Sequence, residues 1–300
     1  MTHIQDIIRA LRPYQWIKNV LVFAGLFFSL SLFNGPLVMK AVMGFLSFVF
    51  ASSSVYLFND IIDIKEDRLH PVKKHRPIPA GRISRTEAIL LSVTLFILAI
   101  LIPVLMINYW FVGIIIAYLL VNISYSFYLK RFVILDVFMI SIGFLLRAMA
   151  GIVAIEVKIS PWIIICTFLL ALFLALGKRR GEFVELNDKA EKHRKSLKGY
   201  SLAFIDNLLG IVCASTIVTY ALYTIADDTV ERFQTQMLIL TTPVVIYMVF
   251  RYLYMLQYKE MGEDPTKMIF NDRPLIIGGL IWVVMVGLII YLKLQLRFYL

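Results

Sequence analysis

An acidic motif follows an apolar run early in the chain. Asn59, Asp63 and Asp67 are spaced at i, i+4 and i+8, so on a helix their side chains lie on one face. Carboxylates gathered at the end of an apolar helix repel one another unless a cation or water lies between them. Mg²⁺ prefers such oxygen ligands and commonly binds a few carboxylates, several waters and substrate phosphates. The motif predicts a magnesium site that binds a diphosphate; the alternative is a solvated helix end whose carboxylates pair with nearby cations.

Basic residues follow the acidic motif directly, at positions 68–77. A diphosphate held by a metal ion alone would keep outer oxygens unpaired in a poorly solvated cleft, so cationic side chains must complete its binding. Lys73 and Arg76 are the candidates for this contact. Lys74 and Arg68 are equally consistent with charges that only hold the loop on the cytoplasmic side of a membrane.

The elements that must position these residues are membrane-spanning helices. Of the 300 residues, 60% are hydrophobic and the mean hydropathy is +0.81, which does not suit a soluble globular surface. A spanning helix needs about 20 mostly apolar residues. Windows of that length predict nine helices, at about 15–33, 38–62, 86–107, 109–127, 133–155, 161–179, 202–226, 236–257 and 275–297. We therefore expect an all-α polytopic membrane protein with a single domain over residues 1–300.

Positive charge is distributed unequally between alternate loops, and the side richer in Lys and Arg is retained in the cytoplasm. Of the 30 basic residues, 23 lie on the side of the N-terminus, and Arg147 and Arg251 lie within spans. Five lie on the opposite side: Lys40, Lys158, Arg232, Lys293 and Arg297. We expect a cell-membrane protein with its N-terminus in the cytoplasm, its C-terminus outside, and its site in the cytoplasmic loops at 64–85 and 178–199. The first apolar run lacks a clear cleavage site, so we expect no removable signal peptide.

The net charge of +10 fits loops at a membrane surface better than a nucleic-acid-binding face, because the basic residues are bunched between apolar runs. We expect the lipid bilayer, and no nucleic acid, as a partner. Cys166 and Cys213 fall within apolar runs, without metal-site or disulfide spacing, and are interpreted as buried packing residues. The sequence leaves open whether the chain forms a homo-oligomer.

The acidic motif also carries a resemblance to a known family. Its pattern at 59–67, Asn-Asp-x-x-Asp-x-x-x-Asp, resembles the first aspartate-rich motif of the UbiA superfamily of intramembrane prenyltransferases. Residues 12–19, Arg-Pro-Tyr-Gln-Trp-Ile-Lys-Asn, resemble the entry to that family's first helix, and residues 125–131, Tyr-Ser-Phe-Tyr-Leu-Lys-Arg, resemble the motif after its fourth. The resemblance covers nearly the whole chain. It implies nine helices around a central cavity that opens laterally to lipid.

The second charged loop departs from the usual pattern of that family, which has an Asp-x-x-x-Asp pair after the sixth helix. Residues 176–185 read Leu-Gly-Lys-Arg-Arg-Gly-Glu-Phe-Val-Glu, with cations where the first carboxylate is expected and Glu182 near the second. A cationic wall suits a donor with more phosphate charge than a prenyl diphosphate, and phosphoribosyl pyrophosphate is such a donor. The alternative is that Lys178, Arg179 and Arg180 only anchor the helix at the inner interface.

This departure resembles one UbiA branch, the decaprenyl-phosphate phosphoribosyltransferases. Gly-Phe-Leu-Leu-Arg-Ala-Met-Ala-Gly at 143–151, with Asp264-Pro265 and Asp272-Arg273-Pro274, adds to the resemblance. The branch implies transfer of 5-phosphoribose from phosphoribosyl pyrophosphate to a polyprenyl phosphate, on the path to a lipid-linked arabinose used in actinobacterial cell-wall biosynthesis. For Arg147, packing within the protein or contact with lipid tails is favoured over contact with the phosphate site.

These inferences combine into one mechanism. Asn59, Asp63 and Asp67 hold Mg²⁺ against the donor diphosphate and stabilise it as a leaving group, so that C1 of ribose gains oxocarbenium character. The lipid phosphate attacks from the opposite face, and as an anion it needs little help from a general base. The candidate substrate-binding residues are Lys18, Lys73, Arg76, Tyr125, Lys130, Arg131, Lys178, Arg179 and Glu182. For Lys130 and Arg131, the lipid phosphate and the donor are equally suitable partners.

Two other functions stay open at this point. An aromatic prenyltransferase would use the same metal site to ionise a prenyl diphosphate, although the missing second aspartate pair disfavours it. A transporter or lipid-binding membrane protein would use the charged loops only to anchor or to gate. The first shares the fold and differs in its donor, whereas the second forms no product.

Overall fold

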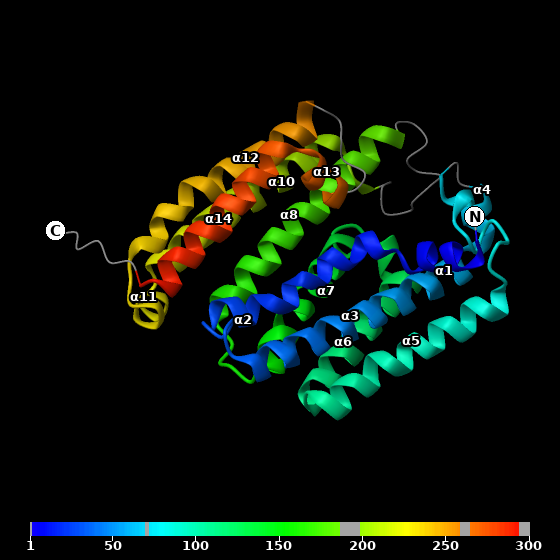
Figure 1. Ribbon diagram of the computed structural model, residues 1–300. Helices are drawn as coiled ribbons and strands as arrows, with labels where there is room; N and C mark the ends of the chain where they lie inside the picture. Colours follow the sequence, from blue (N-terminus) through cyan, green and yellow to red (C-terminus); the bar gives the residue numbers. More distant parts are fainter. Residues whose placement is uncertain (1, 70–71, 187–198, 259–264, 294–300) are drawn as a thin grey trace. The chain divides into compact units, whose positions relative to one another are not determined.

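The computed structural model describes residues 2–69, 72–186, 199–258 and 265–293, and all regular structure in these ranges is helical (Figure 1). Eight helices in this part of the chain are long and apolar enough to cross a membrane. They confirm the prediction of an all-α polytopic membrane protein. The chain divides into two compact units: unit 1 is residues 1–128 and 142–159, and unit 2 is residues 129–141 and 160–300.

The first predicted span differs from a regular α-helix. Residues 15–33 were expected to form one helix, but the chain instead builds the 3₁₀-helix η1 (Pro13–Phe23) and the short helix α2 (Ala24–Phe28). A 3₁₀-helix rises about 2.0 Å per residue against 1.5 Å for an α-helix, so η1 and α2 together extend about 30 Å, the thickness of a bilayer core. This segment is therefore a ninth stretch of the described chain with the length of a span.

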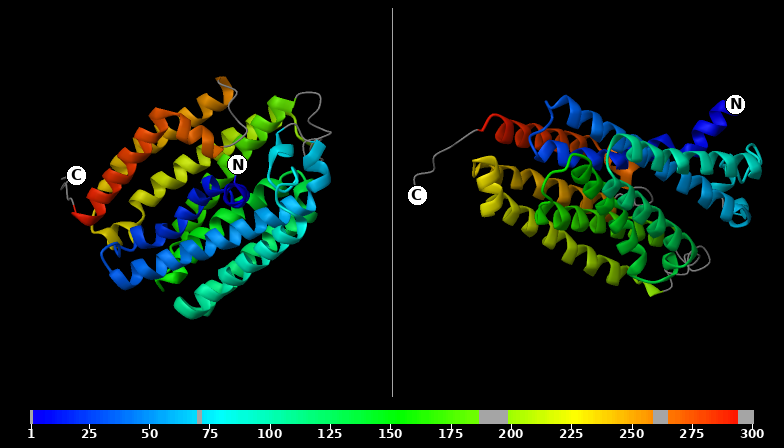
Figure 2. Two further views of the ribbon diagram at one scale, coloured as in Figure 1. Left: turned by 45° about the vertical axis from the view of Figure 1, so that its right-hand side comes forward. Right: turned by 90° about the horizontal axis from the view of Figure 1, so that it is seen from below.

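Unit 1 is built around two long helices that lie side by side, α3 (Gly35–Ile62) and α5 (Arg85–Met106) (Figure 2). The other elements of this unit are α1 (His3–Leu11), η1, α2, α4 (Ile64–Leu69), η2 (Lys73–His75), α6 (Tyr109–Phe127) and the second part of α7 (Leu135–Ala154). Phe48 of α3 anchors the core, with its ring centroid 5.9 Å from that of Phe111 and 5.3 Å from that of Tyr118. Such edge-to-face aromatic contacts add to the dispersion energy of a tightly packed interior.

A glycine allows η1 to lie directly against α7. A Cβ atom added to Gly151 would sit 1.8 Å from the carbonyl oxygen of Val22, a separation that no side chain can tolerate. Gly25 of α2 makes a similar approach, since its Cβ would lie 2.9 Å from the backbone nitrogen of Ile152. Small residues at such crossings let backbones approach closely in membrane proteins. Gly151 and Gly25 thus allow the irregular first span to pack closely against α7.

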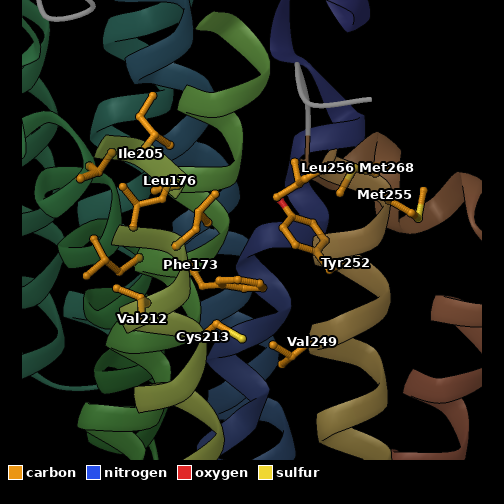
Figure 3. Close-up of a cluster of buried hydrophobic side chains, with 14 of the residues drawn as sticks. Phe173, Leu176, Ile205, Val212, Cys213, Val249, Tyr252, Met255, Leu256 and Met268 are labelled. Carbon is orange, nitrogen blue, oxygen red and sulfur yellow. The ribbon is translucent and has the colours of Figure 1, made fainter. Parts of the chain in front are cut away.

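Unit 2 has its own core, shown in Figure 3. Its elements are η3 (Leu129–Arg131), the first part of α7, α8 (Pro161–Leu186), α10 (Leu202–Ile225), α11 (Asp227–Phe233), η6 (Met237–Thr241), α12 (Thr242–Tyr258), α13 (Pro265–Asn271) and α14 (Arg273–Tyr291). Phe173 and Tyr252 meet at its centre, with ring centroids 5.1 Å apart. Cys213 is buried in this core as predicted, whereas Cys166 is only partly buried.

Helix α8 is longer than its apolar stretch suggests. The sequence predicts its end at residue 179 and a polar loop over 178–199, but the helix continues to Leu186. Lys178 and Glu182 pair at i and i+4, which favours continuation of the helix. The residues compared with the second aspartate motif therefore lie on a helix, and residues 187–198 of the predicted loop lie outside the described part of the chain.

Candidate functional site

The acidic motif lies at the junction of α3 and α4, and two backbone hydrogen bonds span this junction. Helix α3 ends at Ile62 with Asp63 as its C-cap, and α4 begins at the next residue. The Asp63 amide still donates to the Asn59 carbonyl at 2.9 Å, and the Asp67 amide to the Asp63 carbonyl at 2.8 Å. These two i to i−4 bonds span the junction, where Asp63 forms a bend between the two helices. The common face of Asn59, Asp63 and Asp67 stays a prediction from their spacing.

The burial of these side chains suits ligands more than solvated groups. Asp67 is 3% exposed and Asp63 is half-buried. The Oδ1 atom of Asn59 is fully buried and has no hydrogen-bond partner among the described residues. A buried amide oxygen without a partner is costly, and such an atom calls for a cation or water that completes its coordination.

Asp60 is a buried acid that the sequence interpretation missed. It is 1% exposed and forms ion pairs with Arg12, which precedes η1, and with Arg76, whose Nη1 lies 2.9 Å from Asp60 Oδ1. The same Nη1 atom lies 2.8 Å from Asp67 Oδ2, and Lys73 Nζ lies 3.7 Å from Asp67 Oδ1. The two cations predicted to bind a diphosphate therefore do lie beside the acidic motif. Asp60 directly follows Asn59 in the chain. The sequence therefore showed an acid at this position, but one outside the i, i+4 and i+8 spacing of the predicted ligands.

The donor set fits magnesium by its chemistry. No group of three His, Cys, Asp or Glu side chains that could hold a metal ion occurs among the described residues. Two carboxylates and one amide oxygen are nevertheless sufficient for Mg²⁺, which keeps several waters and takes further oxygens from a substrate phosphate. The orphaned Asn59 oxygen supports this assignment. Asn59, Asp63 and Asp67 are therefore the residues that would hold the ion.

Hydrogen bonds from η1 to α3 hold the first span beside this site. Trp16 Nε1 donates to Ser53 Oγ at 3.1 Å, and Asn19 Nδ2 donates to Ser52 Oγ at 3.3 Å. Lys18, a predicted substrate-binding residue, is half-buried on the same 3₁₀-helix. These bonds lie in the segment 12–19, so two of its side chains serve to position η1 against α3.

Three further residues predicted to bind substrate, Tyr125, Lys130 and Arg131, lie at or near the segment that joins α6 to α7. Tyr125 is half-buried near the end of α6. Lys130 is half-buried and Arg131 is exposed, and both lie on η3 in unit 2. The structure thus gives these two cations a short helix of their own immediately before α7.

In unit 2, a second charged cluster forms around Arg179, which is fully buried. Its Nε donates to Asp136 Oδ2 at 2.7 Å, and its Nη1 donates to Glu182 Oε2. The Tyr200 hydroxyl donates to the other oxygen of Asp136 at 2.9 Å. Burial, reinforced by the neighbouring Asp136 carboxylate, raises the pKa of Tyr200, so its hydroxyl keeps its proton. Asp136 is a further functional candidate that the sequence did not reveal, because it stands alone before an apolar run.

The three adjacent cations of α8 have different surroundings. Arg180 donates to Asp206 Oδ1 at 2.7 Å and to the Leu256 carbonyl at 2.6 Å, so it joins three helices of unit 2. Arg179 is enclosed by carboxylates, as described above. The side chain of Lys178 is 41% exposed, and its Nζ lies 3.8 Å from Glu182 Oε1. Lys178 is therefore the cation of this trio that is open to a substrate.

Arg147 lies inside unit 1. Its Nε donates to Asn19 Oδ1 at 2.8 Å, its Nη1 to the Gly143 carbonyl at 2.9 Å and its Nη2 to the Tyr118 hydroxyl at 2.8 Å. Its guanidinium carbon also lies 4.7 Å from the centroid of the Tyr118 ring and 5.3 Å from that of Phe144. These contacts make Arg147 a packing residue that ties η1 to α6 and α7, and they exclude a side chain extended to the membrane surface.

The all-helical membrane fold and the acidic motif flanked by cations agree with membership of a family of intramembrane transferases. The chain belongs to the UbiA prenyltransferase family, whose model matches residues 19–272. It is 30% identical over 302 residues to the decaprenyl-phosphate phosphoribosyltransferase of Mycolicibacterium smegmatis, covering 96% of this chain and 93% of that protein. The protein of the same name from Corynebacterium glutamicum is 30% identical over 293 residues, covering 95% and 86%.

Solved structures show the same fold. A UbiA homologue from Archaeoglobus fulgidus bound to GPP and Mg²⁺ aligns with a TM-score of 0.72 and 21% identity, covering 95% of this chain and 99% of that one. The likeness supports the helical architecture. The family membership and the similarity to curated relatives establish that the chain is a membrane-embedded transferase, so the alternative of a non-enzymatic transporter is set aside.

Proposed function

We propose that this protein transfers 5-phosphoribose from phosphoribosyl pyrophosphate to a polyprenyl phosphate in a Mg²⁺-dependent reaction. The observation that carries the choice of donor and acceptor is the similarity, over almost the full length of both chains, to decaprenyl-phosphate phosphoribosyltransferases. The geometry of the acidic face supports the diphosphate part of the proposal.

The donor diphosphate is assigned to the junction of α3 and α4. Asn59, Asp63 and Asp67 would hold the metal ion, and Lys73 and Arg76 would pair with diphosphate oxygens that the ion does not reach. Bound there, Mg²⁺ would neutralise the charge that develops on the leaving pyrophosphate. The protein's own residues orient the diphosphate so that C1 of ribose is exposed to the acceptor.

The acceptor needs no strong base, because its phosphate is already an anion. An oxygen of the lipid phosphate attacks C1 as the bond from C1 to the pyrophosphate breaks, and the configuration at C1 inverts. We assign Lys130 and Arg131 to binding of the lipid phosphate or the donor, with Lys18 and Tyr125 as further contacts. Lys178 is assigned to the 5-phosphate, with Glu182 held next to it by Arg179.

Orientation follows from the charge distribution. The acidic motif is embedded in the loops that carry most of the Lys and Arg residues, so we place the N-terminus and the site on the cytoplasmic side and the C-terminus outside. Both a sugar diphosphate and Mg²⁺ are available on that side. A cysteine introduced into the loop at 64–85 would test the placement through its reaction with a membrane-impermeant reagent. Labelling of that cysteine from outside the cell would contradict it.

The experiment is mass spectrometry of the lipid products of purified protein incubated with Mg²⁺, phosphoribosyl pyrophosphate and a polyprenyl phosphate. A parallel reaction with a prenyl diphosphate and hydroxybenzoate tests the aromatic prenyltransferase alternative. We expect a phosphoribosylated lipid in the first reaction only, and its loss in Asp63→Asn protein that still inserts into the membrane. Product in the second reaction alone would overturn the donor and acceptor assignment.

A further inference from the structure

Arg76 uses a single nitrogen to bind two carboxylates. Its Nη1 lies 2.9 Å from Asp60 Oδ1 and 2.8 Å from Asp67 Oδ2, and the two acidic side chains are 2% and 4% exposed. The Arg76 side chain itself is 32% exposed, so it reaches this pair from the solvent edge. One of these carboxylates, Asp67, is also among the three side chains assigned to the metal ion.

The two carboxylates differ in what remains when Arg76 leaves. Asp60 also pairs with Arg12, so its charge stays compensated by a second guanidinium. For Asp67 the other cation shown is Lys73, whose Nζ lies at the longer distance of 3.7 Å and whose side chain is 43% exposed. A buried carboxylate needs a close counter-ion. If the Arg76 side chain moves away, Asp67 is left without a close counter-ion, whereas Asp60 keeps its ion pair with Arg12.

We propose that Arg76 and the metal ion compete for Asp67, so that the ion binds tightly only together with the donor diphosphate, which takes Arg76 over. A divalent cation at Asp67 would lie against the Arg76 guanidinium, and two cations on one carboxylate repel each other. The diphosphate offers Arg76 a bidentate anionic partner in exchange. The proposal rests on the metal site assigned under the proposed function and adds the order in which its components assemble.

The backbone around Arg76 allows this exchange without a loop movement. The Arg76 amide donates to the Lys73 carbonyl at 2.9 Å, and the Arg76 carbonyl accepts from the Ala80 amide at 2.9 Å. Both bonds hold the main chain while the side chain changes rotamer, a motion that exposed side chains make in nanoseconds. Arg76 can therefore move between Asp67 and a phosphate as a side chain alone.

The test is a titration of the purified protein with Mn²⁺, followed by electron paramagnetic resonance, with and without inorganic pyrophosphate. In the wild type we expect pyrophosphate to tighten Mn²⁺ binding at least tenfold. In Arg76→Gln protein we expect Mn²⁺ alone to bind on the order of tenfold more tightly than in the wild type, because the competing charge is gone. We expect most of the effect of pyrophosphate to be lost in the same variant.

Arg82→Gln is the matched control. Arg82 belongs to the same loop and forms an ion pair of equal length, 2.8 Å from Nε to Asp6 Oδ1, and it also donates to the His75 carbonyl. The Arg82→Gln variant therefore loses one arginine of this loop but no ion pair to Asp67. We expect its Mn²⁺ affinity to equal that of the wild type. Thermal unfolding of both variants establishes that they are folded to the same extent.

Different results would contradict the competition by Arg76 and the proposed function on which it rests. Mn²⁺ affinity in Arg76→Gln that is unchanged or weaker would overturn the competition, since Arg76 would then be a fixed bridge. Absence of an effect of pyrophosphate in the wild type would overturn it as well, even if the variant failed to fold. If Asp63→Asn left Mn²⁺ binding intact, the metal site itself would be wrong, and the proposed function would fail with it.

Discussion

Replacement of Arg147 tests how the irregular first span is held in place. Arg147→Met keeps most of the side-chain volume but removes the three donors to Asn19, Gly143 and Tyr118. Arg147→Lys keeps the charge but has no planar fork, so it cannot reach all three acceptors. The two variants therefore separate the contribution of the hydrogen bonds from that of the charge.

The magnitude follows from these contacts. Hydrogen bonds within membrane proteins contribute about 0.6 kcal/mol on average and up to about 1.7 kcal/mol. Three bonds from a charged donor then amount to roughly 3–5 kcal/mol in Arg147→Met, since charge-assisted bonds lie toward the upper end of that range. We expect Arg147→Lys to be at least as destabilised, because it leaves a buried cation with fewer partners.

The assay is unfolding in mixed micelles titrated with dodecyl sulfate, combined with hydrogen exchange of the η1 amides. Both variants should unfold at lower dodecyl sulfate, and η1 should lose protection before α3 and α5 do. Full stability in Arg147→Lys together with loss in Arg147→Met would refute the reasoning, because charge alone would then account for the role of Arg147.

Three further predictions follow from single positions. Gly151→Ala should displace η1 and lower stability and turnover sharply, whereas Gly113→Ala, where a Cβ meets nothing within 4 Å, should be neutral; equal effects in thermal unfolding would contradict the close contact. Lys178→Ala should raise the KM for the donor several-fold with little change in the KM for the lipid, and an unchanged donor KM would reduce Lys178 to an anchor. The wild type should lose stability as pH rises past 10.0, the ordinary pKa of tyrosine, because the unfolded chain then releases a proton that buried Tyr200 retains next to Asp136. Tyr200→Phe should lack that part of the loss, and identical pH profiles of unfolding for the two proteins would contradict it.

The sequence predicted the features that depend on local pattern. The apolar runs predicted most spans within a few residues, because hydropathy is a property of each segment. The predicted end was wrong by seven residues for α8 and by six for α14, and the first span is not a regular α-helix. Helical spacing predicts a shared face for Asn59, Asp63 and Asp67, and two i to i−4 bonds span the junction after Ile62. The family followed from the same residues and is confirmed by the match over 19–272.

Features that depend on contacts between distant segments could not be predicted. The pairing of Asp60 with Arg12 joins residues 48 positions apart, and that of Arg179 with Asp136 joins residues 43 positions apart. No local spacing indicates such pairs. Asn19 of η1 likewise bonds to Ser52 and Arg147, which are distant in the sequence, and a window of apolar residues predicted a regular α-helix there.

The most direct test of the central claim follows two labels on the donor. Phosphoribosyl pyrophosphate labelled with ³²P either at the 5-phosphate or at the β-phosphate is incubated with the protein, Mg²⁺ and a polyprenyl phosphate, and the lipid is extracted. We predict that the 5-phosphate label enters the lipid and the β-phosphate label leaves as pyrophosphate, and that both events cease on removal of Mg²⁺ or in Asp63→Asn protein. A β-phosphate label in the lipid, or the absence of label in the lipid when the donor carries ³²P at its 5-phosphate, would contradict transfer of 5-phosphoribose.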